Sequence, residues 1–356
     1  MRKDFYRNVL YQKLNFMNYN RKQMCYKLLR CSLNRSIIVV SLLCAIVIGF
    51  FSSMILMKRN YDSLITLANA TFPDTFWHIK DSYPLPKQKR VLKYDSSFLK
   101  NSSALFTICA RNVAKFLPTF RHNVEQITAV FRDYRILVGE LDSSDDTLVL
   151  IQNWGAEDRK VFLQLYGTLS QVSLLSRSER IAFCRNELLK TARNKKWLLQ
   201  ARYLLVMDVD INANSIFNTE NFLSNFEYDM DSWAVMTASQ TLMYYDVSAL
   251  RSTGADYDYW TVVKRHHHVD IATKIYVTVH MQPIPRYFGL IRVKSAFGGF
   301  AIYQTRYLND CWYRGSEDSN REMSEHLSFH LCIRNNGGNI FINPKFQNAD
   351  GLTHQH

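Results

Sequence analysis

The stretch ARYLLVMDVDINANS, residues 201–215, joins an apolar run to two carboxylates, Asp208 and Asp210. A continuous apolar run of this length is typical of a strand buried on both faces of a parallel sheet. The Asp-x-Asp spacing is not specific by itself, because residues 229–231 and 256–258 repeat it without such a run. In open α/β sheets ligands bind beyond the carboxyl ends of the strands. The position of the pair at a strand end therefore indicates a binding site, with a solvated loop as the alternative.

Strands and helices alternate around this stretch. Apolar runs at 104–110 and 134–140 predict two further strands, and residues 178–195 predict a helix that leads into the acidic strand. This alternation predicts an α/β fold with a mainly parallel, doubly wound sheet. Beyond Tyr228 the pattern changes and predicts mixed strands at 233–240, 269–280 and 290–303, then a helix at 322–336.

A second acidic cluster follows the strand at 134–140. It contains Glu140, Asp142, Asp145 and Asp146. Paired carboxylates at strand ends suit Mg²⁺ or Mn²⁺, which use few protein oxygens and share their coordination with phosphates. A cation held there stabilises the charge of a departing diphosphate. The sequence therefore predicts a divalent-cation and diphosphate site.

The basic charge of the chain is concentrated at its N-terminus. Residues 1–35 hold nine Lys and Arg against one acid, so they carry +8 of the formal +13. The folded part is therefore not expected to bind nucleic acid. Residues 36–57 follow, 22 positions without a charge, enough to cross a hydrocarbon core of about 30 Å. This run is too long and lies too deep in the chain for a cleaved signal peptide.

We therefore expect a basic cytoplasmic tail (1–35), one transmembrane signal-anchor helix (36–57), a lumenal stem (58–103) and a catalytic domain (104–356). The excess of Lys and Arg before the span predicts this orientation. N-glycosylation sequons at Asn69 and Asn101 agree with a lumenal stem.

Four of the seven cysteines fall in the predicted lumenal part, where disulfides form. Cys109, Cys184, Cys311 and Cys332 allow three full pairings. Cys311–Cys332 is the favoured pair, and buried free thiols are the alternative.

A series of motifs along residues 104–350 resembles nucleotide-sugar glycosyltransferases of the GT-A fold. Within that class it is similar to a group distantly akin to the fungal capsule-associated mannosyltransferases. The motifs are ICARNVAKFLP (108–118), LVGELDSSDDT (137–147), RIAFCRNELL (180–189), YLLVMDVDI (203–211), AFGGFAIY (296–303) and EHLSFH (325–330). The resemblance implies a Rossmann-like, mainly parallel sheet with mixed C-terminal strands. It also implies hexosyl transfer, mannosyl transfer included, from a UDP- or GDP-sugar with Mn²⁺ or Mg²⁺.

The resemblance assigns donor-site roles to several residues. Glu140 and Asp142 match a loop that contacts the nucleotide base and ribose. Asp208 and Asp210 match the metal-binding pair, with Asp210 the more direct ligand and Asp208 nearer the ribose. A helix motif that lines the donor site corresponds to Arg180, Arg185 and Asn186, and arginine suits a diphosphate through its fork of donors.

Acceptor-side roles follow from the same resemblance. Gly298 and Gly299 match a glycine pair near the acceptor, where substrate approaches the backbone. Glu325 matches a residue that acts as general base in inverting members. Many such enzymes have Asp at the next position, whereas this chain has His326, so the base and the stereochemical course stay open.

Each of these residues also has a purely structural interpretation. His330 lies four positions after His326, a spacing that can bind metal, and it is the candidate third ligand, with His280 and His354 as rivals. The run at 266–268 is expected as a solvated loop. For the others the alternatives are pairing of Arg180 and Arg185 with Glu179 or Glu187, a polar turn at Glu140 and Asp142, and a tight bend at Gly298 and Gly299.

The sequence thus predicts a type II membrane glycosyltransferase of the Golgi or ER that glycosylates a glycan or glycoprotein hydroxyl. A non-catalytic, membrane-anchored glycan-binding or scaffold protein is the alternative. An aspartyl-phosphate phosphohydrolase is a further one, disfavoured because Asn212 stands where such enzymes commonly have Thr or Val. The donor sugar, the acceptor and the oligomeric state do not follow from the sequence.

Overall fold

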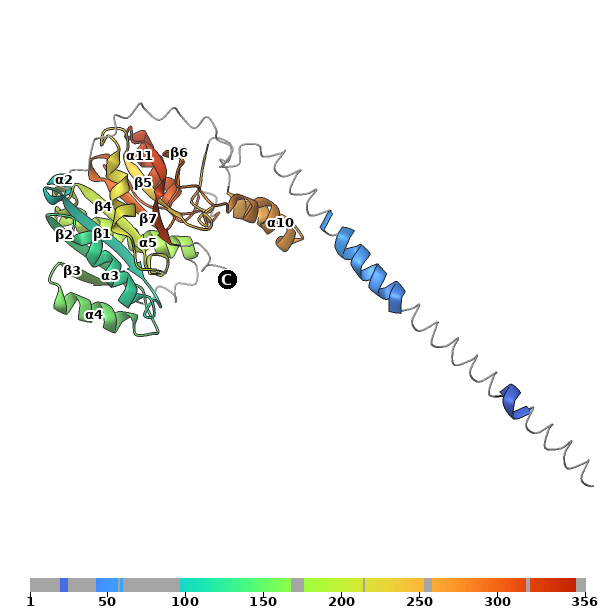
Figure 1. The fold of residues 1–356 in the computed structure, drawn as a ribbon. Helices are drawn as coiled ribbons and strands as arrows, with labels where there is room; N and C mark the ends of the chain where they lie inside the picture. The colour runs from blue at the N-terminus through green and yellow to red at the C-terminus, as the bar shows by residue number, and fades with distance from the viewer. Residues whose placement is uncertain are drawn as a thin grey trace, which may run out of the picture. The chain divides into compact units, whose positions relative to one another are not determined.

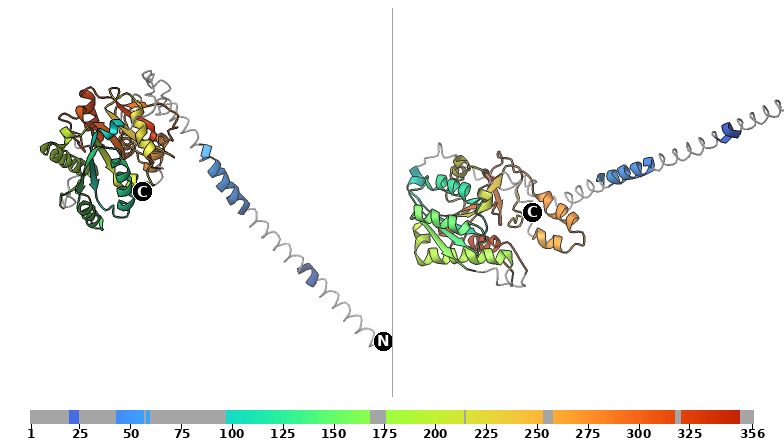
Figure 2. Two further views of the ribbon diagram at one scale, coloured as in Figure 1. Left: turned by 60° about the vertical axis from the view of Figure 1, so that its left-hand side comes forward. Right: turned by 90° about the horizontal axis from the view of Figure 1, so that it is seen from below.

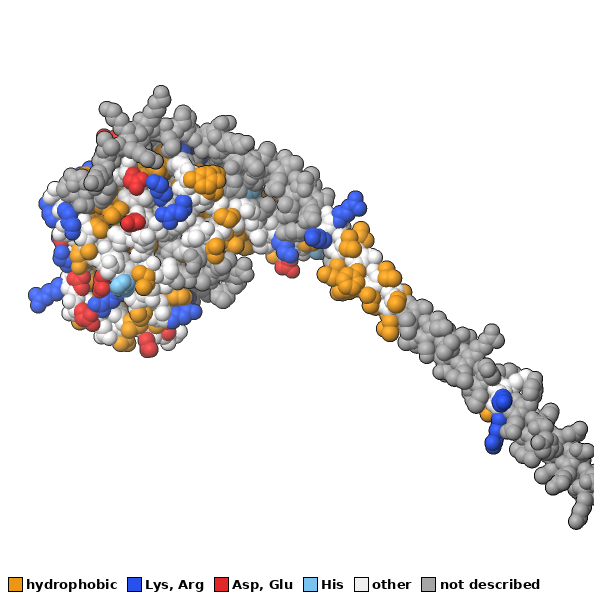
Figure 3. Space-filling view, viewed as in Figure 1, with side chains coloured by type: hydrophobic (Ala, Val, Ile, Leu, Met, Phe, Trp, Pro, Cys, Tyr) orange, Lys and Arg blue, Asp and Glu red, His pale blue; other side chains and the backbone are white. Residues whose placement is uncertain are grey.

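The computed structural model describes residues 20–24, 43–56, 58–59, 97–167, 176–213, 215–252, 258–317 and 321–349. The chain divides into two compact units, Met1–Leu67 and Ala68–His356. In the first unit residues 43–56 form a helix whose apolar side chains are exposed (Figure 3). Among the described residues, no helix is both long and apolar enough to cross a membrane. Residues 36–42 and Met57 of the predicted span, Asn69, and all of 60–96 in the predicted stem lie outside the described residues.

The second unit is built on an eight-stranded mixed sheet (Figure 1). Its strand order is β3-β2-β1-β4-β7-β5-β8-β6. Strands β1 to β4 are parallel, β7 is antiparallel to both β4 and β5, β8 is parallel to β5, and β6 is antiparallel to β8. This confirms the predicted α/β sheet with mixed C-terminal strands. The strands are β1 (Ser103–Ala110), β2 (Asp133–Glu140), β3 (Val161–Leu165), β4 (Tyr203–Asp208), β5 (Val235–Gln240), β6 (Ile291–Val293), β7 (Phe300–Gln304) and β8 (Ile340–Ala349).

Two helical layers cover the sheet because successive strand residues face opposite sides. Leu105 and Leu204 pack in one buried cluster, while their neighbours Phe106 and Leu205 pack in the other. The layers can be followed in Figures 1 and 2. The first cluster receives α5 (Arg177–Asn194), α6 (Trp197–Gln200) and α11 (His326–Asn335), and the second receives α3 (Leu117–Thr128), α4 (Thr147–Glu157) and α8 (Thr219–Leu223).

A topological switch point lies between β1 and β4. The chain passes from β1 to β2 on one side, and β4 is added on the other side of β1. In the Cα register, Ala110 of β1 is opposite Glu140 and Cys109 is opposite Asp208. The carboxyl ends of three parallel strands therefore lie side by side where open α/β sheets bind ligands.

The remaining helical elements are short. They are α2 (Ser97–Lys100), α7 (Val209–Asn212), α9 (Tyr259–Lys264), α10 (Val269–Tyr276), η2 (Ser224–Glu227), η3 (Thr278–His280) and η4 (Thr305–Tyr307). Leu99 of α2 is buried in the core, so packed structure already begins before the predicted boundary at residue 104.

The prediction of a strand at 269–280 is wrong. Residues 269–276 form the helix α10, which lies with α9 outside the layers of the sheet (Figures 1 and 2). Ala272 of α10 packs with Val263 and Tyr259 of α9 and with Val277 in a small cluster of their own. Ala272 and the partly buried Tyr276 face this cluster, whereas Val269 and Ile271 of the same helix are exposed.

Two disulfides cross-link the second unit. Cys109 of β1 is bonded to Cys184 of α5, and Cys311 is bonded to Cys332 of α11. The favoured pairing of Cys311 with Cys332 is confirmed, and the alternative of free thiols is excluded for these four residues. Both disulfides involve helices of the layer that packs on the first cluster. One links α5 to β1, and the other links α11 to the segment that contains Cys311.

Candidate active site

Two carboxylates lie at the switch point. Asp208 is the last residue of β4, and Asp210 lies in the short helix α7 that follows directly. Both residues are partly exposed, and the Asp208 side chain retains 37% of its accessible surface. The structure thus places the predicted pair where a ligand can reach it.

A buried guanidinium bridges the site. Arg185 of α5 donates from Nη2 to Asp208 Oδ1 at 3.0 Å, and its Nε lies 3.2 Å from Glu325 Oε1. Its side chain is only 6% exposed. Burial alone would lower the pKa of Arg185, but the carboxylates of Glu325 and Asp208 raise it above its ordinary value. Arg185 therefore stays charged and joins β4 to the start of α11.

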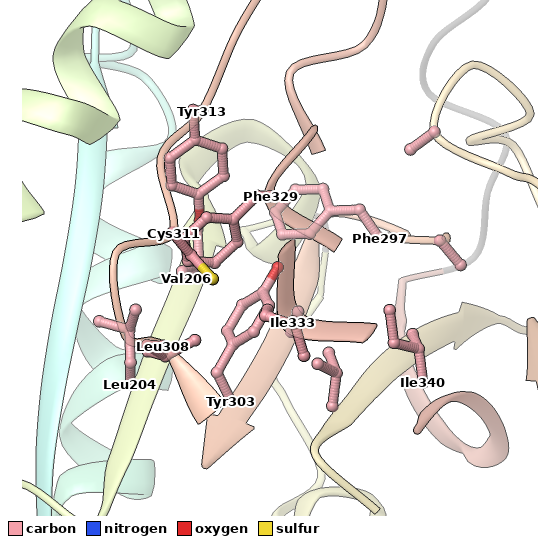
Figure 4. Packing of buried hydrophobic residues seen from close by; sticks show 14 of the residues in the cluster. Leu204, Val206, Phe297, Tyr303, Leu308, Cys311, Tyr313, Phe329, Ile333 and Ile340 are labelled. Carbon is pink, nitrogen blue, oxygen red and sulfur yellow. The ribbon is translucent and has the colours of Figure 1, made fainter. Parts of the chain in front are cut away.

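Aromatic rings enclose this guanidinium. The Arg185 Cζ atom lies 4.8 Å from the centroid of the Phe297 ring and 5.6 Å from that of Tyr313. His326 stacks on Phe297 with a centroid distance of 3.8 Å. Figure 4 shows Phe297, Tyr313 and Phe329 in one cluster around the hydroxyl of Tyr303. Such rings stabilise a buried cation through their π faces.

Asn186 is bonded to the backbone of Tyr313. Its Nδ2 donates to Tyr313 O at 2.9 Å, and its Oδ1 accepts from Tyr313 N at 2.8 Å. Both polar ends of the side chain are therefore used on the protein backbone. The structure thus shows Asn186 as a support for Tyr313, and its place in the lining of the donor site stays a prediction.

The electrostatics of Asp208 indicate crowded negative charge. Although the Asp208 side chain reaches solvent, desolvation by the surrounding protein raises the pKa of its carboxyl from the ordinary 3.8 to about 7, Arg185 opposes this shift, and the charges of Asp210 and Glu325 add to it. A divalent cation bound at the pair would relieve this repulsion.

The chemistry of the acid pair thus fits Mg²⁺ or Mn²⁺ shared with phosphate and water ligands. In the part of the chain that the structure describes, no three His, Cys, Asp or Glu side chains converge as a ready metal site. Asp208 and Asp210 would therefore hold the ion with help from the substrate.

His330 does not lie at the acid pair as a third ligand. It is fully buried, its Nδ1 lies 2.9 Å from Ser295 Oγ, and its Nε2 lies 3.0 Å from Tyr303 Oη. Burial, with the charge of Arg185, lowers the pKa of His330 to about 3. Both ring nitrogens bond hydroxyl groups inside the core, so His330 is a structural residue here.

Among the described residues, no other histidine replaces it at the acid pair. His280 is buried against the ring of Tyr259, and burial lowers its pKa to about 4. Residues 266–268 are exposed, as expected for a solvated loop. His354 lies outside the described residues.

Gly298 and Gly299 are buried beneath the acid pair, and the structure does not show them at an open acceptor surface. Gly298 and Gly299 have φ angles of +66° and +77°. A Cβ on Gly298 would lie 2.3 Å from Ala238 O, and one on Gly299 would lie 2.8 Å from Tyr245 Oη. Asp208 N donates to Gly299 O at 2.9 Å. Glycine is required here because β7 begins in direct contact with the acid turn.

Glu140 and Asp142 hold the neighbouring loops together. Glu140 is buried and its Oε1 accepts from Ser143 N at 2.7 Å. Asp142 pairs with Arg111 Nε at 2.9 Å. This arrangement corresponds to the polar-turn alternative, at the end of β2, which β1 separates from the strand of Asp208. Their contact with a nucleotide stays a prediction.

Arg180 is partly exposed on α5. It lies five positions before Arg185, about 140° away around the helix. The structure therefore sets the two predicted arginines on different sides of α5. The charge that acts on Asp208 from the start of this helix is Arg177, which lowers the pKa of Asp208. The sequence reasoning missed Arg177.

A further carboxylate and a phenol near the pair were also missed. Asp246 accepts from Gly298 N at 3.0 Å and from Ala249 N at 3.2 Å. Burial raises the pKa of Asp246, and these backbone donors oppose the shift. Burial also raises the pKa of Tyr245, with contributions from Asp246, Asp208 and Asp210. Neither residue belongs to a motif of the sequence. Both lie in the loop after β5, and only the fold brings this loop to the site.

Comparison with known proteins gives weak likenesses. No protein family and no curated protein matches the chain. It is similar to the mannosyltransferase PcManGT from Pyrobaculum calidifontis in complex with GDP-Man and Mn²⁺, at 10% identity and a TM-score of 0.43, covering 83% of this chain and 70% of that one. It is similar to S. aureus TarS 1-349 in complex with UDP-GlcNAc, at 13% identity and a TM-score of 0.38, covering 67% and 55%.

A third similar structure is glucosyl-3-phosphoglycerate synthase from Mycobacterium tuberculosis in complex with UDP, at 9% identity and a TM-score of 0.31, covering 61% of each chain. The chain spans less than two thirds of the length of TarS 1-349 and of this synthase. At such identities and TM-scores, these likenesses leave the activity, donor and metal of the chain to be argued from its own residues.

Proposed function

We propose that the chain is a metal-dependent glycosyltransferase that moves a hexose from a nucleotide-sugar donor to a hydroxyl of a glycan or glycoprotein. The observation that carries the proposal is the buried Arg185 bridging Asp208 and Glu325 at the switch point, with Asp210 beside them. Charges of both signs at the carboxyl ends of parallel strands suit a nucleoside diphosphate and its cation.

The residues divide the chemistry as follows. Asp208 and Asp210 would hold Mg²⁺ or Mn²⁺, which when bound supplies positive charge to the departing diphosphate. Arg177 and Arg185 add fixed positive charge on the α5 side. The acceptor oxygen forms a bond to C1 of the sugar as the bond from C1 to the diphosphate oxygen breaks. The acceptor proton passes to a carboxylate.

Glu325 is the candidate for that carboxylate, and the structure adds Asp246 as a second. Glu325 is held near Arg185 and its side chain is 9% exposed, whereas Asp246 is partly exposed beside Gly298. The two carboxylates thus differ in access to solvent. Matched substitutions of each show which one takes the proton of the acceptor.

The membrane topology belongs to the same proposal. We propose a type II protein with its catalytic domain in the lumen of the Golgi or ER. Two disulfides in the second unit suit an oxidising compartment. Asn101 is exposed in the turn between α2 and β1, which suits a glycosylated position. The exposed apolar side chains of helix 43–56 suit a lipid environment.

One alternative has specific support. Glu140 and Asp142 are bonded to Ser143 N and to Arg111 Nε, which favours a glycan-binding or scaffold protein that has the fold without turnover. Hydrolysis of a nucleotide-sugar without acceptor separates the two functions.

The test uses the full chain purified in detergent, screened against UDP- and GDP-sugars with Mn²⁺ or with EDTA. Asp210→Asn is compared with Asp231→Asn, an acid of a second Asp-x-Asp pair that is exposed and bonded to Arg306. We expect one donor to be turned over only with metal, with loss in Asp210→Asn and retention in Asp231→Asn. Binding of a glycan without turnover of any donor would favour the alternative.

A further inference from the structure

Buried amide side chains form a connected network beneath the acid pair. Asn212 of α7, Gln240 of β5 and Asn348 of β8 are each no more than 2% exposed. Asn348 Nδ2 donates to Asn212 Oδ1 at 3.1 Å, and Gln240 Nε2 donates to Asn348 Oδ1 at 3.0 Å. Asn348 and Gln240 also both donate to Gly298 O at 2.9 Å.

Asn212 connects this network to the turn that carries the acids. Its Nδ2 donates to Asp208 O and to Gly299 O, each at 2.7 Å. One amide therefore closes the turn from β4 into α7 and attaches it to the start of β7. The orientation of Asn212 is in turn fixed by Asn348, since its Oδ1 accepts from that residue.

Amides suit this place for a physical reason. Apolar side chains would leave the carbonyl groups of Asp208, Gly298 and Gly299 with fewer donors in the interior. A negatively charged side chain would add to the negative charge crowded at the acid pair. A positively charged one would oppose that charge without holding the turn in a fixed geometry. A neutral amide donates and accepts at once, so the network is internally satisfied.

We propose that Asn348 is a positioning residue for the acid pair. Through Asn212 and Gly298 it fixes the turn that carries Asp208 and Asp210, although it comes from a strand 136 positions after Asn212. The positioning follows from the hydrogen bonds described above. Its consequence, a higher affinity of the pair for a divalent cation, rests on the proposed function.

The same strand provides a matched control. Asn343 is also fully buried in β8, but its Nδ2 donates to Ser224 Oγ at 3.0 Å and to Asn225 Oδ1 at 2.8 Å. These partners belong to η2. Alanine at 343 or at 348 removes the same atoms from the same strand, and only the second change removes a bond to the acid turn.

The experiment compares full-length Asn348→Ala and Asn343→Ala with the unchanged chain, without metal, by hydrogen–deuterium exchange and mass spectrometry. We expect Asn348→Ala to accelerate exchange in residues 205–213 by about tenfold, as expected for the loss of buried hydrogen bonds. Asn343→Ala should accelerate exchange near 222–227 and leave 205–213 unchanged. If Asn348→Ala exchanges faster throughout the sheet, Asn348→Ser, which leaves a smaller cavity, replaces it in the comparison.

A second measurement titrates Mn²⁺ alone and follows the free ion by electron paramagnetic resonance. The apparent Kd should rise about tenfold in Asn348→Ala and stay constant in Asn343→Ala. If 205–213 exchanges equally in the Asn348 and Asn343 variants, the positioning proposal is overturned. If the unchanged chain binds no Mn²⁺, the metal site of the proposed function is wrong, and the exchange result still decides the role of Asn348.

Discussion

Arg185 is the residue on which the candidate site depends most directly. Replacing it with Leu leaves the buried Glu325 and the partly exposed Asp208 without their shared counterion. We expect a loss of about 3–5 kcal/mol in the free energy of unfolding and at least about a hundredfold in donor turnover. Urea unfolding and nucleotide-sugar hydrolysis measure the two effects. Lys190→Leu on the same helix, where the exposed ammonium pairs weakly with Glu187, should change stability by under about 1 kcal/mol.

The raised pKa of Asp208 predicts a pH-dependent cation affinity. Because its pKa of about 7 exceeds the ordinary 3.8, the folded metal-free protein binds more protons at this group than the unfolded chain between those values. The stability that Asp208 contributes is therefore fully present below pH 4 and is lost as the pH rises through 7.

Mn²⁺ must displace that proton, so its affinity should fall by up to about tenfold per pH unit below 7. The stabilisation of the protein by Mn²⁺ should grow between pH 6 and 8, measured as the shift in Tm with and without the ion. In Asp208→Asn this pH trend should disappear. An Mn²⁺ affinity that is constant from pH 5 to 8 would contradict the assignment.

The two candidate bases give a third prediction at this scale. Glu325→Gln and Asp246→Asn each remove a charge while keeping the shape of the side chain. The base should lose transfer to the acceptor by about 10²–10⁴-fold, with donor binding changed much less. The ratio of the effects on kcat and on KM for the donor identifies which carboxylate takes the proton. Equal, small effects would mean that neither does.

At the scale of elements, the Cys109–Cys184 disulfide holds α5 against the sheet where the site lies. Cys109 is opposite Asp208 in the sheet register, and Cys184 precedes Arg185. The loops closed by the two disulfides differ, 75 against 21 residues. Chain entropy then predicts losses of about 4.5 and about 3 kcal/mol on their removal.

Double replacement of each pair by Ser, followed by urea unfolding and donor hydrolysis, tests this difference. Without Cys109–Cys184 the folded protein should also lose donor turnover, since α5 can shift relative to Asp208. The Cys311–Cys332 variant should keep more of its turnover once its stability is allowed for. If the Cys311–Cys332 variant lost more turnover than the Cys109–Cys184 variant, α11 would control the geometry of Arg185.

The elements also show how far the sequence could predict this protein. The apolar strand 203–208 and the helix that begins after Ser176 follow from local signals, since Ser176 and Glu179 form a capping box. The strand predicted over α10 failed because helical pairing with α9 decided its structure. Arg185, Asp208 and Asp210 could be proposed from residue type and strand end. Asp246 and Asn348 could not, because only the sheet order brings their loop and strand to the acids.

At the scale of the whole molecule, the proposed topology can be tested in cells that have a secretory pathway. We expect the full chain to carry glycans at Asn69 and Asn101 and none at Asn34, whose sequon Asn34-Arg35-Ser36 begins before the apolar span. A glycosidase should lower the apparent mass, and Asn69→Gln with Asn101→Gln should remove the shift. Asn34→Gln should leave the shift unchanged. Glycosylation of Asn34 would reverse the proposed orientation.

The place of β8 in the sheet has a consequence for biosynthesis. Asp208 and Asn212 are made long before Asn348, which lies almost at the end of the described chain. Because domains fold as they emerge from the ribosome, a nascent chain that has reached β7 already contains the acids but lacks the amide that secures their turn. Ribosomes stalled before β8 should therefore expose a loose, protease-sensitive acid turn, and the site matures only once β8 has been made.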